Sequence, residues 1–346
     1  MMSEPVSSAP RIALIIVNYN TPQDTVQCLE SVFQLKHNAH LDIIIVDNGS
    51  KDDSVSIIGD YLANKKGTLL PLEENRGYAA GCNAGIRAAG HWLLASGNPQ
   101  AAIHAVHRSL FTVRPFPAFY WLLNNDTILD PNALRALLTS AKAHPRVKIW
   151  GSSIYDLTQG PEEKESVTQR RNERKDKHRL QCAAGFRYLP VLSIPIPIKR
   201  SPEKFKGQTC VQDKRLAYIS GVSMFVAADV FDKGLMDESY FLYYEELELV
   251  RLAGGREHIA WCPDSVVYHK GGAATGGADP NRGRGSYAAH YYGNRSALKY
   301  TWKYYKGYFP IVFVFRFIVK SVLFILYGEW RGFKPMVRGY GDFIKL

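Results

Sequence analysis

The sequence has few cysteines, and their spacing excludes several classes of protein. Five cysteines lie far apart among 346 residues: Cys28, Cys82, Cys182, Cys210 and Cys262. They form no CxxC pair and no His/Cys cluster of zinc-ligand spacing, so neither a zinc module nor a disulfide framework is expected. No predicted strand is followed by GxGxxG, which argues against a dehydrogenase. The N-terminus lacks a basic segment with an apolar core, so we expect a cytoplasmic chain without an export signal.

Acidic residues are scarce in one part of the chain only. The net charge is +11, and residues 282–346 contain twelve Lys/Arg but only two Asp/Glu. The first 281 residues are therefore almost neutral. We predict a flexible N-terminus over 1–10, one catalytic domain over 11–281, and a basic, aromatic helical tail over 282–346 that binds an anionic surface.

Short apolar runs alternate with helical patterns in the first 150 residues. The runs at 12–17, 41–46, 69–72 and 119–123 predict strands. Helices are predicted after Thr21-Pro22, over 54–62, after Gly77 and after Asp130-Pro131. This alternation is typical of βαβ units, so we predict an α/β domain around a mostly parallel sheet.

Two segments, near 91–117 and 160–210, interrupt this pattern as insertions. We assign no chemistry to either segment. His104 and His107 in the first have no carboxylate partner in the sequence and are more typical of a surface pair than of a metal site. The part of the second up to Arg179 mixes both charge signs, which favours a solvated loop.

Polar side chains follow three of the predicted strands. They are Asn18–Asn20, Asp47–Ser50 and Asn124–Asp126. Ligands of open α/β sheets bind at the carboxyl edge of the strands, so three such endings predict a cleft there. The alternative is that these residues only form turns.

Two further features of the second half could carry chemistry. Glu245, Glu246 and Glu248 follow Phe241, Tyr243 and Tyr244, and aromatic surroundings would raise the pKa of a carboxyl group toward the range of a general base. His269 ends a strand-like run before a glycine-rich segment, where it could bind a metal. The alternatives are an exposed acidic helix start and a structural histidine.

Taken in order, these motifs resemble the family 2 glycosyltransferases, particularly the branch of bacterial rhamnosyltransferases and galactofuranosyltransferases. The matching motifs are Ile16-Val17-Asn18-Tyr19-Asn20, Val46-Asp47-Asn48-Gly49-Ser50, residues 74–83, residues 122–127, Ser220-Gly221, residues 241–249 and Val267-Tyr268-His269. The resemblance implies a GT-A fold and transfer of a sugar, with inversion, from a nucleotide diphosphate donor linked to dTDP or UDP. The expected acceptor is a glycan or a lipid-linked glycan of a bacterial surface polysaccharide, and rhamnose is the expected sugar.

The resemblance also implies roles for individual residues. Asp126 and His269 would bind Mg²⁺ or Mn²⁺, and Glu246 takes the place of the catalytic base. The expected nucleotide and substrate contacts are Asn18, Tyr19, Asn20, Asp47, which would pair with the base, Asn75, Gly77, Asn83, Asn124, Gly221 and Glu245.

Two positions depart from the family pattern. Asn124 stands where many relatives have Asp, and Glu246 stands where Asp is usual. These departures leave open a weakened or inactive relative that only binds nucleotide sugars. A nucleotidyltransferase of related fold is a second alternative, although such enzymes carry a glycine-rich loop where this chain has residues 18–22.

The tail combines basic and apolar helical patterns. Arg295, Lys299, Lys303 and Lys306 share one face of a helix, and an apolar run over 311–327 follows, broken by Arg316, Lys320 and Ser321. Two central charges disfavour a spanning helix at about 2.5–3.5 kcal/mol each. We expect a helix that lies on the inner face of the cytoplasmic membrane, with packing against the catalytic domain as the alternative and without nucleic-acid binding.

Overall fold

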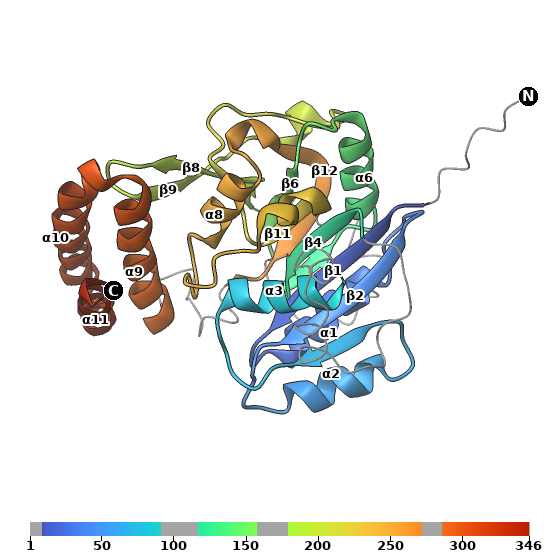
Figure 1. Cartoon of the computed structure of the whole chain (residues 1–346), viewed down its shortest axis with the longest axis horizontal. Coiled ribbons are helices and arrows are strands. Elements are labelled where there is room, and N and C mark those ends of the chain that lie inside the picture. The colour runs from blue at the N-terminus through green and yellow to red at the C-terminus, as the bar shows by residue number, and fades with distance from the viewer. Residues whose placement is uncertain (1–8, 91–116, 158–178, 272–285, 346) are drawn as a thin grey trace, which may run out of the picture.

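A computed structural model describes residues 9–90, 117–157, 179–271 and 286–345, whose centre is a nine-stranded sheet (Figure 1). Across the sheet the strands are β3 (Thr68–Pro71), β2 (His40–Asp47), β1 (Arg11–Asn18), β4 (Phe119–Asn124), β11 (Ser223–Ala227), β6 (Ile149–Asp156), β12 (Ile259–His269) and β5 (Thr127–Leu129), with β7 (Leu180–Ala183) beside β6. Strands β1 to β4 are parallel, as are β6 and β12, while β5, β7 and β11 run antiparallel to their neighbours. The predicted α/β architecture with a mostly parallel sheet is confirmed.

Helices cover both faces of this sheet because its central strands are apolar on both sides. Leu14 and Ile16 of β1 pack toward α1 (Pro22–Val32), α2 (Ser54–Leu62) and α6 (Ala133–Ala143). Ala13 and Ile15 pack toward α3 (Tyr78–Ala88) and α8 (Glu245–Leu252). Successive side chains of a strand point to opposite faces, so a continuous apolar run becomes the middle layer of a three-layer domain.

The register of the parallel strands brings the polar strand ends together. Asn18 is paired with Asp47 across β1 and β2, and Val17 is paired with Asn124 across β1 and β4. The three polar endings therefore lie side by side at the carboxyl edge of the sheet, as predicted.

A second, three-stranded antiparallel sheet lies beside the first. It consists of β10 (Tyr218–Ile219), β8 (Gly185–Leu189) and β9 (Ile194–Pro197). The described part of the segment predicted as an insertion, residues 179–210, thus contains β7, β8, β9 and the short helix η2 (Pro202–Phe205). The predicted loop up to residue 178, residues 1–8, and the 91–116 segment with His104 and His107 lie outside the described residues.

The tail forms three helices that pack on one another beside β8 and β9 (Figure 1). They are α9 (Tyr287–Tyr304), α10 (Phe309–Tyr327) and α11 (Phe333–Ile344). Their shared core contains Leu298, Val312, Phe324, Met336 and Tyr340. The side chain of Ser286 caps α9 by accepting a hydrogen bond from the backbone N–H of Ala289 at 3.1 Å.

The basic face of α9 does not extend freely into solvent, contrary to the expectation of a lipid-binding stripe. The Lys303 ammonium group lies 3.1 Å from carboxylate oxygens of both Asp237 and Glu248. The Lys299 ammonium group lies 4.7 Å from the ring centre of Tyr240. These two cations therefore fasten the tail to the catalytic domain, which corresponds to the alternative of a packed helix.

Helix α10, unlike α9, has an apolar surface that is largely exposed. By length and composition the segment Lys306–Tyr327 could cross a membrane. An 18-residue window of this segment has a mean hydropathy of 2.3, and only 11% of that window is buried. Apolar side chains that are normally buried are exposed along it, for example Leu326 at 71% and Val314 at 55%. An exposed apolar face of this kind marks an interaction surface.

Candidate functional site

A cavity of about 910 Å³ opens at the carboxyl edge of the large sheet. Its walls come from the strand ends, from residues 218–222 and 241–247, and from α9 and α10. Nine residues that the sequence singled out line it: Tyr19, Asn75, Gly77, Asn124, Asp126, Gly221, Glu245, Glu246 and His269. Segments far apart in the sequence thus contribute to one site, of a size typical for a small-molecule ligand.

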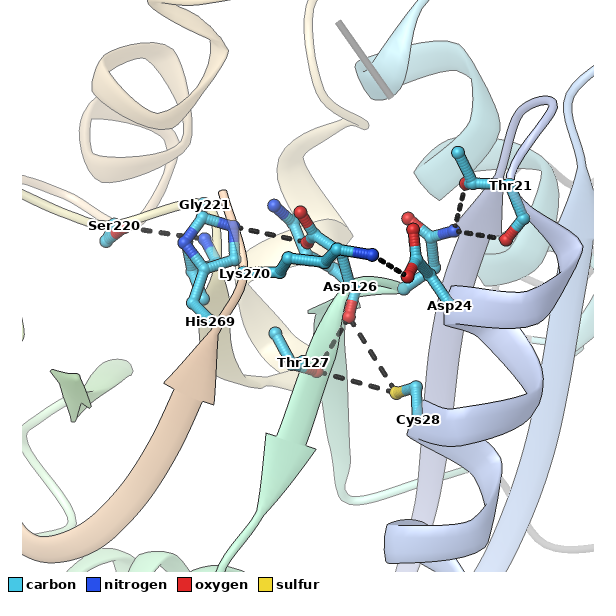
Figure 2. A network of polar contacts seen from close by, with 12 residues as sticks. Thr21, Asp24, Cys28, Asp126, Thr127, Ser220, Gly221, His269 and Lys270 are labelled. Atoms are coloured by element: carbon cyan, nitrogen blue, oxygen red, sulfur yellow. Dashed lines mark hydrogen bonds and ion pairs between the residues drawn. The ribbon is translucent and has the colours of Figure 1, made fainter. Parts of the chain in front are cut away.

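Asp126 and His269 lie side by side in the wall of this cavity. Asp126 lies in the turn between β4 and β5, and His269 ends β12, which pairs with β5 (Figure 2). The Nε2 atom of His269 lies 3.2 Å from Oδ1 of Asp126. Both side chains are well buried, with 13% and 5% of their surfaces exposed.

Gln181 orients the ring of His269. Its Oε1 atom lies 3.0 Å from Nδ1 of His269, and its amide nitrogen donates to the His269 carbonyl oxygen at 3.3 Å. With Nδ1–H donating to Gln181, Nε2 is the ring nitrogen that faces the Asp126 carboxylate. A second ring-nitrogen bond of the Gln181 type is typical of metal-binding histidines.

The residues present therefore fit a divalent cation with two protein ligands. The described residues contain no cluster of three or more His, Cys, Asp or Glu side chains that could bind a metal. Mg²⁺ and Mn²⁺ sites with few protein ligands are completed by phosphate oxygens and water. The expected cation site is thus one that needs a bound diphosphate.

Glu246 also lines the cavity, at the start of α8. Burial raises the pKa of its carboxyl group to about 7, although the backbone N–H groups of Glu246, Gly221 and Tyr244 act in the other direction. The sequence-based expectation of a raised pKa is confirmed. A carboxylate with this pKa is suited to accept a proton near neutral pH.

Glu245, the residue before Glu246, is also buried and has a raised pKa. Its side chain is only 2% exposed, and burial together with the charge of Glu246 raises its pKa well above the usual range. Its carboxyl group therefore retains the proton to higher pH than an exposed glutamate does, and when protonated it has an O–H group to donate. The two neighbouring carboxyl groups thus have different roles available to them.

Strained backbone presents these two acids. Tyr243 and Tyr244, which immediately precede α8, have φ angles of 66° and 74°. A left-handed conformation is costly for bulky residues and persists where the surroundings enforce it. Here the Tyr244 hydroxyl donates to the Ser193 carbonyl oxygen at 2.9 Å, which fixes the turn from the second sheet.

Several predicted nucleotide contacts hold the strand ends together and do not line the cavity. Asp47 is 1% exposed, and its carboxylate accepts hydrogen bonds from the Asn18 amide at 2.7 Å and the Ser50 hydroxyl at 2.7 Å. Asn20 joins the same network, since its backbone N–H donates to Ser50 Oγ at 2.9 Å. A direct contact between Asp47 and a base would require this network to open.

Asn83 is also occupied elsewhere. Its amide nitrogen donates to the Met236 carbonyl oxygen at 2.9 Å and to Glu238 at 3.0 Å, and its amide oxygen accepts from the Met236 N–H at 3.1 Å. It fastens α3 to the 236–238 segment. By contrast, Asn75 lines the cavity, and its side-chain oxygen accepts from the Gly77 N–H at 2.9 Å.

The Thr21 side chain connects the start of α1 to the turn that contains Asp126. Helix α1 begins at Pro22 as expected, but the Thr21 side chain makes no cap hydrogen bond. Its hydroxyl oxygen accepts instead from the Asn125 amide at 2.7 Å. Asn125 donates to Thr25 as well, so the turn that contains Asp126 is attached to α1.

The cavity also contains polar residues that were not identified as site residues from the sequence. Tyr78 donates from its hydroxyl to the Gly221 carbonyl oxygen at 3.0 Å. Arg316 and Lys320 of α10 line the cavity as well. Their spacing of four residues was a usable signal, because it places two cations on one helix face.

Residues 13–95 match the family Glycosyl transferase family 2. The matched segment runs from β1 past the end of α3 and includes Tyr19, Asn75 and Gly77 of the cavity wall.

Two curated relatives are glycan-building enzymes. The poly-beta-1,6-N-acetyl-D-glucosamine synthase of Staphylococcus epidermidis is 34% identical over 136 residues, which are 39% of this chain and 26% of the relative. The amylovoran biosynthesis glycosyltransferase AmsE of Erwinia amylovora is 22% identical over 154 residues, 44% of this chain and 48% of the relative. The chain thus spans about a quarter and about half of the lengths of these relatives.

Solved structures share the fold. The mannosyltransferase PcManGT from Pyrobaculum calidifontis, in complex with GDP-Man and Mn²⁺, covers 98% of this chain and 88% of its own at a TM-score of 0.52 and 12% identity. GalNAc-T7 with UDP, GalNAc and Mn²⁺ covers 76% of this chain and 44% of its own at 0.51 and 14%. The predicted GT-A fold is confirmed, and the similarities support a glycosyltransferase as the class of enzyme.

Proposed function

We propose that this chain is an inverting glycosyltransferase. It moves a sugar from a nucleotide diphosphate donor to a glycan or lipid-linked acceptor during synthesis of a surface polysaccharide. The observation that supports this most is a single cavity that is lined by Asp126, by His269 and by Glu246, whose carboxyl group has a pKa of about 7.

The reaction is a single displacement at the anomeric carbon. Glu246 accepts the proton of the acceptor hydroxyl as its oxygen bonds to that carbon. The bond between the carbon and the diphosphate oxygen breaks, and the nucleoside diphosphate leaves with the bonding electrons. One displacement inverts the configuration, and general-base help of this kind contributes roughly 10²–10⁴-fold.

The other residues prepare this step. Asp126 and His269 would bind Mg²⁺ or Mn²⁺, which when bound neutralises charge on the leaving diphosphate. Glu245, as an acid, can donate a hydrogen bond to a sugar oxygen. Asn124 stands where many relatives have Asp, so the site around Asp126 and His269 has one negative charge fewer than in those relatives. We therefore expect tight cation binding only together with the nucleotide.

We propose a dTDP- or UDP-linked donor, with rhamnose as the sugar that the motif resemblance favours. A thermal-shift panel of nucleotide sugars tests this, because a ligand of the folded state raises the melting temperature according to its affinity. The panel includes GDP-mannose, since GDP-Man is the donor bound to PcManGT. A larger shift with GDP-mannose than with dTDP-rhamnose would contradict the rhamnose proposal.

We also propose that the enzyme acts at the inner face of the cytoplasmic membrane. The exposed apolar surface of α10 supports this placement. Vesicle flotation of the full chain tests it, with Ile318→Glu and Val322→Glu as variants that charge the exposed face. Both variants are expected to leave the vesicle fraction, and equal flotation of variants and wild type would contradict the proposal.

The decisive test of the reaction is Glu246→Gln. This variant cannot accept the proton, so turnover should fall by at least about 100-fold while binding of the nucleotide with Mn²⁺ is retained. Glu248→Gln is the matched control, because Glu248 lies on the same helix but binds Lys303 outside the cavity. Normal turnover of Glu246→Gln, or a wild-type chain that hydrolyses no donor with Mn²⁺, would contradict the proposed function.

A further inference from the structure

Helix α10 has two different long faces. One face lines the catalytic cavity with Phe315, Arg316, Val319, Lys320 and Leu323. Counted from Phe315, the other four residues lie one, four, five and eight positions further along the chain. This spacing places all five on one side of a helix. Another side carries the exposed apolar residues Ile311, Val314, Ile318, Val322 and Ile325. The helix therefore separates the cavity from the surface proposed to contact lipid.

The cavity face contains two cations, Arg316 and Lys320, and the charge of Glu329 acts on Lys320 against the effect of Arg316. The Arg316 guanidinium donates to the carbonyl oxygens of Ser193 at 2.7 Å and Gly293 at 3.1 Å, and its buried Nε–H has no hydrogen-bond partner. In the described residues, neither Arg316 nor Lys320 forms an ion pair with a carboxylate.

This arrangement is unfavourable unless an anion enters. Like charges four residues apart on a helix repel each other, and removal of a charge from water is costly when it is not paired. Burial and the neighbouring Arg316 lower the pKa of Lys320 to about 8, so the ammonium group remains charged at neutral pH. Two partly buried cations at four-residue spacing suit a phosphate or a diphosphate.

The position of the pair indicates which molecule brings the anion. Asp126 and His269, which line the cavity from other elements, are the proposed site of the donor's diphosphate. Arg316 and Lys320 are surrounded by Phe315, Val319 and Leu323. An anion bound among these side chains would have apolar walls beside it, as an amphiphile needs.

We propose that Arg316 and Lys320 bind the phosphate or diphosphate of a lipid-linked acceptor, whose hydrocarbon chain leaves the cavity along α10. This inference rests on the proposed function and names the acceptor class. The lipid anion anchors one end of the acceptor, and the sugar attached to it extends toward Glu246.

Binding of farnesyl diphosphate to the full chain in detergent micelles tests the proposal. Titration calorimetry with EDTA present keeps divalent cations out of the Asp126 site. Farnesyl diphosphate should bind the wild type, and Lys320→Met should weaken this binding by about tenfold or more, because a charge-assisted contact is lost. Lys320→Arg keeps the charge and should restore binding, which distinguishes a lost contact from a misfolded variant.

Matched comparisons separate the possible sources of binding. Lys306→Met removes an exposed tail lysine outside the cavity and should bind like the wild type. Farnesol has the chain without the anion, and inorganic diphosphate has the anion without the chain. Equal binding of farnesol, equal binding of inorganic diphosphate, or unchanged binding by Lys320→Met would each overturn the proposal.

Asp126→Asn makes the outcome independent of the catalytic proposal. This variant should lose Mn²⁺-dependent UDP binding and keep farnesyl diphosphate binding, whereas Lys320→Met should do the reverse. If Lys320→Met loses UDP binding as well, the lipid site is refuted. If only the UDP result for Asp126→Asn fails, the cation site of the proposed function is refuted and the lipid site stands.

Discussion

A Cβ atom on Gly221 would lie 2.8 Å from Oε1 of Glu246, so the absence of a side chain at this glycine leaves the space that the carboxylate occupies. The Gly221 N–H also lowers the pKa of the Glu246 carboxyl group by hydrogen bonding to it. Gly221→Ala should therefore displace the carboxylate. Misplacement by about 1 Å can cost about 100-fold in rate, so we expect kcat to fall by tenfold or more.

Steady-state kinetics with saturating donor, together with calorimetry of UDP and Mn²⁺, measures this effect. Donor affinity should stay within about threefold of wild type, since Asp126 and His269 are untouched. Gly341→Ala is the control: it is a glycine of α11 with no heavy atom within 4 Å of the added Cβ. If Gly221→Ala keeps its kcat, the position of Glu246 does not limit the reaction.

The pH dependence follows from the raised pKa of Glu246. A general base must be deprotonated, so kcat/KM should fall about tenfold per pH unit below pH 7 and level off above it. Glu246→Gln should lose this limb together with most of the rate. Initial rates from pH 5 to 9 at constant ionic strength provide the measurement, and a rate that rises as the pH falls would assign the group the opposite role, that of an acid.

The sheet and its binding edge could be predicted from the sequence because they depend on local patterns. A run such as Ile12–Val17 is apolar on both faces, and a polar ending marks where the strand stops. Parallel pairing then brings Asn18 beside Asp47 without any further information. Which of these polar residues face the cavity could not be predicted, because Asn18 and Asp47 satisfy each other only once the two strands are aligned.

The features that could not be predicted from the sequence depend on contacts between distant segments. Gln181 reaches His269 because β7 pairs with β6, and β6 pairs with β12, across a separation of 88 residues. The basic pattern of α9 was clear in the sequence, but its partners Asp237 and Glu248 lie on another part of the chain. Periodicity shows which residues share a face and does not show what that face contacts.

The contact between Gln181 and His269 predicts a role in cation binding. Gln181→Leu removes the acceptor for Nδ1–H and leaves the ring free to turn, so Mn²⁺ affinity in the presence of UDP should fall by about 10–100-fold. Calorimetric titration of Mn²⁺ measures it. Gln212→Leu is the matched control, because Gln212 donates to the Glu257 carbonyl oxygen on the surface. Equal Mn²⁺ affinities of the two variants would remove Gln181 from the site.

A comparison of Gly77 with Gly90 distinguishes two destabilising effects of an added side chain. One is the left-handed backbone conformation, and the other is steric overlap with a neighbouring segment. The φ angles of the two glycines are 94° and 92°, yet a Cβ at Gly77 would overlap the carbonyl group of Phe241, whereas a Cβ at Gly90 meets no atom within 4 Å. Gly90→Ala should cost only the conformational penalty of about 1–2 kcal/mol. Gly77→Ala adds the overlap and disturbs the Tyr78 N–H bond to Phe241, so we expect a loss above about 3 kcal/mol.

Urea unfolding of both variants measures this difference. Because the Phe241 carbonyl precedes the turn that presents Glu245 and Glu246, Gly77→Ala should also lower turnover in the fraction that remains folded. Gly90→Ala lies at the far end of α3 and should keep full activity. Equal unfolding free energies for the two variants would show that the Phe241 segment yields to the added atom. The positions of Glu245 and Glu246 would then not depend on how closely Gly77 approaches the Phe241 segment.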